Sequence, residues 1–225
     1  MKVSEYIDHL IVGECSKLTF SSVGDMTSNP GSPTAVQIVN RAKWVKFINL
    51  ANLALHKRYH LLRKEFVMDY PVDGEEYTLP ANFLVPIRAF YTADNDKVSI
   101  RNDDTAMVSD VDTLVSILID EPFKARIKGV DQDVPVRTEI TLKYAASPTK
   151  ATTIFKDLQI SDVYTEALLN YVAYKAHTSI DGDIKGENNT YYLRYEASCK
   201  QLVNQGLSPN NQMVGNTKLE DRGFV

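Results

Sequence analysis

Residues 179–189, SIDGDIKGENN, have the residue types and spacing with which a calcium-binding loop begins. Asp181 and Asp183 stand at the first and third places, and a glycine follows at the sixth, where such a loop turns sharply. The fifth place, however, holds Lys185, and the twelfth holds Tyr192 instead of the glutamate that closes the coordination sphere. We therefore expect a polar turn between two helices and no calcium site.

The spacing of histidine and cysteine does not match the common zinc motifs, although a histidine pair four residues apart on a helix is able to chelate a metal when it is not simply solvated. Only His56 and His60 stand four residues apart, and Lys57 occupies the place where a zinc peptidase helix has glutamate. The cysteines, Cys15 and Cys199, are too far apart in sequence for a paired zinc motif or a disulfide framework. Cys199 falls on an apolar helical stripe and is predicted to be a core residue. We expect no metal and no other cofactor.

The acidic pairs also lack a catalytic context. Asp103 with Asp104, and Asp131 with Asp133, lie in polar turn sequence, where aspartate favours turns. An unrecognised site built on these pairs is the enzyme alternative. The sequence contains neither a glycine-rich phosphate loop nor a nucleophile motif. It therefore predicts a protein that is not an enzyme.

Composition describes an ordinary globular protein. The 225 residues, 44% of them apolar, are enough for one sizeable domain or a main domain with a smaller insertion. A formal charge of −4 gives no overall attraction to nucleic acid or to an anionic membrane. The first residues lack the apolar run of a secretion signal, and no segment has the roughly 20 apolar residues of a bilayer span. We expect no conventional export and no membrane contact.

Helical periodicity appears at both ends of the chain. Apolar spacing predicts a short helix over 2–13, a long helix near 34–62, and an αα-hairpin of helices over 162–179 and 187–205. Between 65 and 150 the pattern changes to short β-rich runs separated by turn residues. This change predicts a small antiparallel β unit.

Proline and aspartate add detail to the β-rich region. Pro80, Pro86 and Pro122 favour strand ends and edges, because proline has no N–H to donate to a central ladder. The run from Asp110 to Pro122 is ambiguous between strand and helix. Asp110 and Asp112 are able to cap a short helix that the proline must follow.

The expected fold is mainly α with an inserted small antiparallel β unit: a long-helix bundle, an αα-hairpin and an extended C-terminal arm. The predicted helical body comprises 1–64 and 160–206, the β-rich insertion 65–159, and the arm 207–225. The arm has too few apolar residues to pack a core of its own. The residues able to anchor it on another protein are Leu219, Arg222, Phe224 and Val225.

The long helix carries charge of one sign, and no acid precedes Glu65 in this region. Such a face is either solvated, or directed at an acidic partner or at DNA phosphates. The basic residues predicted to contact a partner, if the face is not simply solvated, are Arg41, Lys43, Lys46, Lys57 and Arg58.

Several stretches together carry a family likeness. They are Trp44 and INLANLALHKRYHL in the long helix, EEYTLPANFLVPIRAFY after it, and ITLKYAASP leading through ISDVYTEALLNYVAYKAHTSIDGD into the last helix. In this order, over residues 1–206, the chain resembles the head-to-tail adaptor, or connector, proteins of tailed bacteriophages, especially those of short-tailed phages.

The resemblance implies a structural virion protein at the head-tail junction, assembled in the host cytoplasm. It implies a homo-oligomeric ring, typically of about twelve copies, that joins the portal protein to the tail or nozzle protein. Double-stranded DNA passes transiently through the channel of such a ring during genome retention and ejection. Carried onto this chain, the arm from about Leu207 lies on the portal, and the basic helix residues contact neighbouring subunits or the portal before they contact DNA.

The alternative is a non-enzymatic regulatory or interaction module whose helical hairpin presents a groove to one partner. Such a module is expected to be a monomer or dimer.

Overall fold

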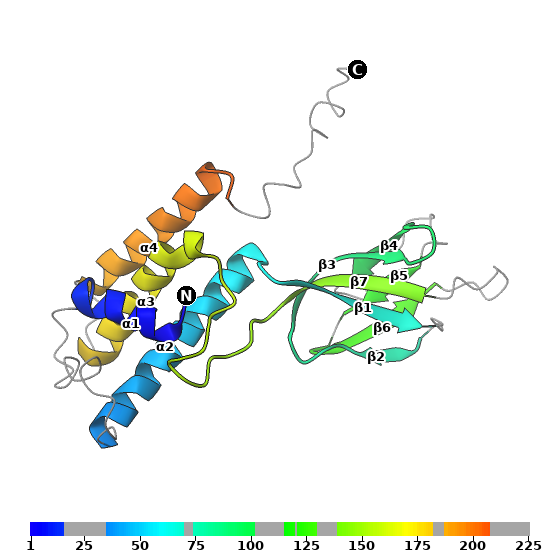
Figure 1. Cartoon of the computed structure of the whole chain (residues 1–225). Helices are drawn as coiled ribbons and strands as arrows, with labels where there is room; N and C mark the ends of the chain where they lie inside the picture. The colour runs from blue at the N-terminus through cyan, green and yellow to red at the C-terminus, as the bar shows by residue number, and fades with distance from the viewer. Residues whose placement is uncertain are drawn as a thin grey trace, which may run out of the picture. The chain divides into compact units, whose positions relative to one another are not determined.

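The computed structural model describes residues 1–15, 35–69, 74–101, 115–119, 121–129, 139–181 and 187–207. These residues form four α-helices and a sheet of seven strands (Figure 1). The chain divides into two compact units, Met1–Tyr59 with Pro148–Val225, and His60–Ser147. The first unit contains the helices and the second contains the sheet.

The helices of the first unit confirm the helical periodicity of the sequence. They are α1 (Val3–Val12), α2 (Ala35–Tyr59), α3 (Thr165–Asp181) and α4 (Glu187–Asn204), with a 3-10 turn at Asp162–Tyr164. Helix α3 contacts each of the other three helices, and α1 also contacts α2. The predicted hairpin is therefore α3 and α4, packed against each other.

One stripe of α2 forms much of the core of the helical unit. Trp44, Ile48 and Leu55 are buried at helical spacing and face the other helices. The Tyr59 hydroxyl donates a hydrogen bond of 3.0 Å to the backbone carbonyl of Cys199 in α4. Cys199 itself is fully buried, which confirms its prediction as a core residue. The long helix is thus held along its length by packing rather than by its own propensity.

Helix α2 ends three residues before the predicted boundary at 62. His60, the first residue after it, has φ of 50°, in the left-handed region where many helices end. Strand β1 begins shortly afterwards, at Arg63. The apolar spacing in the sequence thus continues for about one turn after the helix itself has ended.

Backbone groups of a distant segment cap the first turn of α1. The Val3 N–H donates to the Lys156 carbonyl at 3.1 Å, and the Ser4 N–H donates to the Ile154 carbonyl at 2.8 Å. These bonds satisfy two of the N–H groups that a helix N-terminus leaves without an intrahelical partner. Between the two acceptors lies Phe155, whose side chain is 72% exposed. The capping segment therefore places an exposed aromatic ring beside α1.

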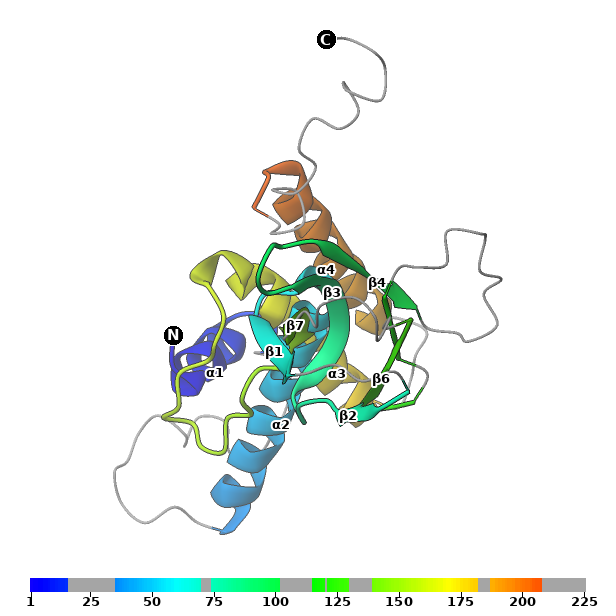
Figure 2. The ribbon, with the colours of Figure 1, turned by 90° about the vertical axis from the view of Figure 1, so that its right-hand side faces the viewer.

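The second unit is a mixed sheet of seven strands in the order β1-β7-β3-β4-β5-β6-β2. The strands are β1 (Arg63–Asp69), β2 (Glu76–Thr78), β3 (Phe83–Tyr91), β4 (Lys97–Arg101), β5 (Ser116–Leu118), β6 (Lys124–Lys128) and β7 (Glu139–Ala146). All pairs are antiparallel except β4 with β5, which is parallel. Seen end-on, the strands curl round until the sheet nearly forms a barrel (Figure 2).

The inside of this curl is a hydrophobic core of its own. Strand β7 pairs with β1 on one side and β3 on the other, and most of its residues are buried. Strand β6 alternates buried and half-buried residues, as a strand with one core face should. The large buried core residues are Met68, Leu79, Val98, Ile117, Ile127, Ile140 and Leu142.

The expected fold class is therefore wrong. The β region is not a small antiparallel attachment to a helical bundle, because seven strands build a mixed sheet with a separate core. Strand β5 lies in the run that we could not assign between strand and helix, and its residues 116–118 are a strand parallel to β4. Pairings such as β1 with β7 join residues far apart in the chain, and local periodicity carries no trace of them.

The prolines behave as expected except for Pro86. Pro80 follows β2, and Pro122 precedes β6. Pro86 instead lies inside β3, the third strand in the order of the sheet. The β3–β7 register shifts between Pro86 and Arg88, so the proline falls at a bulge where the ladder is already interrupted.

Candidate interaction surface

The described part of the chain brings together no metal-binding constellation. The acidic pairs of the enzyme alternative, Asp103 with Asp104 and Asp131 with Asp133, lie outside the described residues. No group of three or more histidine, cysteine or acidic side chains there is placed to hold a metal ion. His56 is buried, and its Nδ1 lies 2.9 Å from the Asn52 carbonyl oxygen. Burial lowers the pKa of His56, so this is a neutral core histidine. Residues 182–186 of the polar turn lie outside the described residues.

Membrane contact through a spanning helix has no structural support. Among the helices that the structure describes, none combines the length and the apolar character that crossing a bilayer requires.

The solvent side of α2 is a basic and apolar surface. Lys43, Lys46, Leu50 and Lys57 are exposed and point away from the buried stripe of the helix, and Leu50 is 48% exposed. We call these four residues the α2 face. Helix α2 contains no acidic residue at all. Within the described ranges, none of the three lysines forms an ion pair.

The solvent side of α1 has the opposite charge. Glu5, Asp8 and Val12 are exposed at i, i+3 and i+7, and Val12 is 85% exposed. We call these three residues the α1 face. Helix α1 contains no lysine or arginine. Composition alone did not reveal this surface, although the spacing of its residues is visible in the sequence.

Arg58 is held by its own chain rather than left free on α2. Its Nη1 and Nη2 donate to Oε1 and Oε2 of Glu196 in α4, at 2.7 and 2.9 Å. The guanidinium carbon lies 5.9 Å from the ring centroid of Tyr59 and 5.6 Å from that of Tyr195. The bidentate bond lowers the pKa of Glu196 and raises the pKa of Arg58. The pair therefore joins α2 to α4.

A double-mutant cycle on Arg58→Gln and Glu196→Gln should give a coupling free energy of about 1 kcal/mol, because both side chains are partly exposed. The pKa of Glu196 is lower in the folded than in the unfolded chain, so this stabilisation is complete above the unfolded pKa and is lost as pH falls through the folded one. Urea unfolding at several pH values measures both effects. Lys57→Gln, which removes an exposed charge of α2 that forms no ion pair in the described ranges, is the matched control. A coupling near zero would show that the bond contributes nothing to stability.

Tyrosine rings form the seam between α3 and α4. The ring of Tyr171 lies 5.0 Å from that of Tyr195, and the ring of Tyr174 lies 5.2 Å from that of Tyr192, between centroids. Tyr192 is the residue that stands where a calcium loop would have its closing glutamate. Its packing in the hairpin gives it a structural role.

Comparison with known proteins identifies the family. A family model described as SU10 adaptor protein matches residues 34–214, a range that includes α2, the sheet, α3 and α4. The chain belongs to the SU10 adaptor protein family. No curated protein matches it. The family match confirms the resemblance to phage head-tail adaptors and places this adaptor in a structural class of proteins.

The structure locates only part of the predicted contact set of the adaptor. Lys43, Lys46 and Lys57 lie together on the α2 face, whereas Arg58 lies beside it in the bond with Glu196. Arg41 is within α2, but its side chain is outside what the structure describes. The predicted portal anchors are also outside the described residues; they are Leu219, Arg222, Phe224 and Val225.

Proposed function

We propose that this adaptor forms a ring of about twelve copies that joins the portal to the tail in the virion of a short-tailed phage. The family match over residues 34–214 is the observation that supports this proposal. In this ring the helical unit is the body, and double-stranded DNA passes through the central channel during retention and ejection of the genome. The ring assembles in the host cytoplasm.

The same proposal assigns the contacts. The C-terminal arm lies on the portal through Leu219, Arg222, Phe224 and Val225. The exposed lysines of the α2 face contact protein before they contact DNA, because a channel through which DNA must slide should not bind phosphates tightly.

Removal of the arm tests this proposal directly. We expect the full chain, mixed with the portal ring of the same phage, to give a complex with about twelve adaptor copies. A variant ending at Leu207 should leave the portal ring bare, because it lacks the anchors. Native mass spectrometry measures the number of bound copies in both mixtures. A full-length variant carrying Leu219→Ala and Phe224→Ala should bind fewer copies than the unaltered chain and more than the variant ending at Leu207.

Two outcomes would contradict the proposal in different ways. A full chain that stays a monomer or dimer and ignores the portal would favour the regulatory or interaction module. A ring that forms equally well with the variant ending at Leu207 would retain the ring and exclude the arm as the portal contact.

A further inference from the structure

The two helices with exposed faces are opposite in charge and alike in having an exposed apolar residue. On the α1 face the exposed charges are Glu5 and Asp8, and on the α2 face they are the lysines Lys43, Lys46 and Lys57. Val12 and Leu50 add apolar area to the two faces. A surface that combines one sign of charge with exposed apolar side chains is suited to a partner of the opposite sign.

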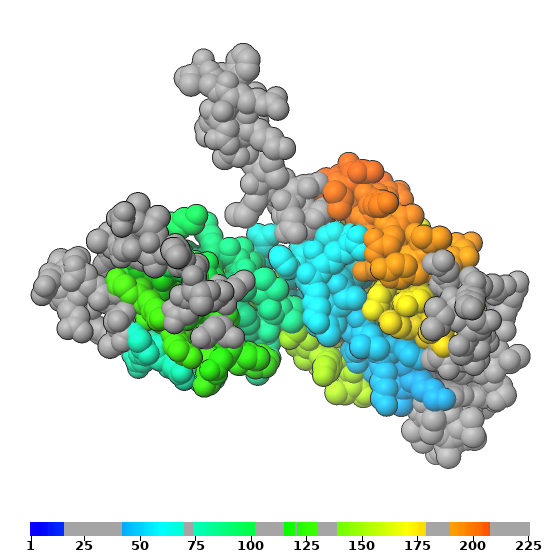
Figure 3. Space-filling model, turned by 180° about the vertical axis from the view of Figure 1, so that it is seen from behind, coloured from blue at the N-terminus to red at the C-terminus, as the bar shows by residue number. Residues whose placement is uncertain are grey.

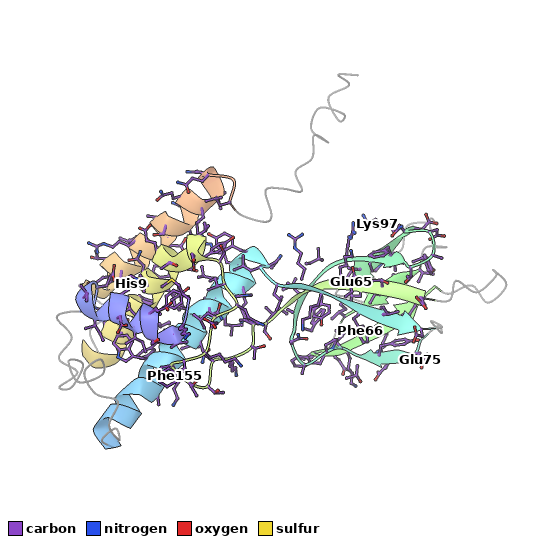
Figure 4. All side chains as sticks on the ribbon, in the orientation of Figure 1. His9, Glu65, Phe66, Glu75, Lys97 and Phe155 are labelled. Atoms are coloured by element: carbon purple, nitrogen blue, oxygen red, sulfur yellow. The ribbon has the colours of Figure 1, made fainter. Side chains whose placement is uncertain are left out.

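The α1 face is extended by the capping segment. Phe155 is exposed and lies in the chain between the two residues whose carbonyls cap the first turn of α1 (Figure 4). Lys2, Lys156 and Asp157 are also exposed at this end. The excess of negative charge therefore lies toward the middle of α1, at Asp8, with apolar residues on either side of it.

Helices α1 and α2 both lie at the surface of the helical unit. Figure 1 shows α1 in front of α3, and Figure 3, from behind, shows α2 at the surface in light blue beside α4. Both helices belong to the compact unit that contains Met1–Tyr59. One copy thus presents a basic helix face and an acidic helix face to solvent.

We propose that the α2 face of one adaptor copy binds the α1 face, with Phe155, of the next copy. This assignment rests on the proposed ring and names the surfaces that build it. Two different but complementary faces of one chain make a head-to-tail contact, which every copy repeats with the next. Such a series closes into a ring when the rotation between neighbouring copies divides a full turn evenly. The contact pairs Lys43 and Lys46 with Asp8 and Glu5, and it buries Leu50, Val12 and Phe155.

Cysteine cross-linking tests which surfaces meet. The native thiols do not interfere, because Cys15 and Cys199 are both buried and burial raises the pKa of the Cys15 thiol to about 12. A full chain carrying both Asp8→Cys and Lys46→Cys, assembled on the portal ring, should give a ladder of covalent multimers with a short bis-maleimide. A chain carrying Asp8→Cys and Arg194→Cys, with Lys46 unchanged, should give none, because Arg194 is exposed on α4 and belongs to neither face.

Charge exchange tests complementarity. Asp8→Lys alone and Lys46→Glu alone should each weaken assembly at least about 10-fold, since each places like charges opposite one another. An equimolar mixture of the two variants should recover assembly, because every contact in an alternating ring again joins opposite charges. Lys97→Glu and Asp69→Lys, both exposed in the sheet unit, are the matched controls and should assemble as the unaltered chain does.

The results separate this assignment from the ring itself. If rings form but the Asp8→Cys and Lys46→Cys chain gives no ladder, and the mixed variants do not recover, the two faces are not the contact. If the unaltered chain forms no ring alone or on the portal, the proposed function fails first. Recovery by the mixture together with the ladder would establish the contact.

Discussion

Leu168→Ala should lower the free energy of unfolding of the helical unit by about 3 kcal/mol. Leu168 is fully buried in α3, the helix that contacts α1, α2 and α4. Truncation removes apolar contacts at the centre of the unit and leaves a cavity that three surrounding helices cannot easily fill. The loss should therefore be near the middle of the range known for leucine in well-packed cores.

Fluorescence of Trp44 measures this loss. Trp44 is the only tryptophan of the chain and is buried in α2, so its emission reports the helical unit. Leu193→Ala is the matched control, because Leu193 is 61% exposed on α4 and its truncation should cost less than about 0.5 kcal/mol. Equal shifts of the urea midpoint in the two variants would contradict the central place that we give to α3.

Leu142→Ala should destabilise the sheet unit by a similar amount, about 3 kcal/mol. Leu142 is fully buried on β7 and lies opposite Phe66 of β1 and Ala89 of β3. Strand β7 is hydrogen-bonded to β1 on one side and to β3 on the other. A cavity at Leu142 therefore loosens the packing of all three strands. The expected cost is therefore that of a core truncation and not that of an edge residue.

Amide hydrogen exchange measures the second effect strand by strand. Exchange in β1, β3 and β7 should become faster by about two powers of ten in Leu142→Ala, as a loss of this size implies when exchange follows unfolding of the unit. Val67→Ala is the control, because Val67 is on the edge strand β1 and is 44% exposed. Acceleration confined to β1 would show that β7 does not hold the sheet together.

The sequence predicted the helices because their information is local. A stripe such as Trp44, Ile48 and Leu55 repeats at the period of the helix, and each of these residues is buried in α2. The same reasoning predicted Cys199 as a core residue, and the structure confirms it. The helix end was less certain, since a left-handed residue such as His60 leaves no mark on apolar spacing.

The sheet could not be assembled from the sequence in the same way. Short β-rich runs predicted most strands, but strand order depends on which segments meet, and β1 pairs with β7 across the whole length of the unit. The parallel pair β4 and β5 was hidden for the same reason. A count of strands without their partners made the region look like a minor insertion.

The same distinction between local and long-range information applies to the residues of the candidate surface. The sequence showed that the long helix is basic, and the structure leaves Lys43, Lys46 and Lys57 exposed on its outer side. It did not show that Arg58 bonds Glu196, because the partners are 138 residues apart. Nor did it show the acidic α1 face, which acquires meaning only when Phe155 is brought beside it by backbone hydrogen bonds.

By itself, the sequence determined the periodic helices, the lack of a recognisable catalytic motif and the likeness to phage adaptors, which the family match confirms. Tertiary structure alone decided the mixed sheet, the Arg58 bond and the exposure of the α1 and α2 faces. The physical reason is the distance along the chain between the residues that interact. Helical spacing is fixed within a few residues, whereas strand pairing, ion pairs and shared faces depend on segments that only folding brings together.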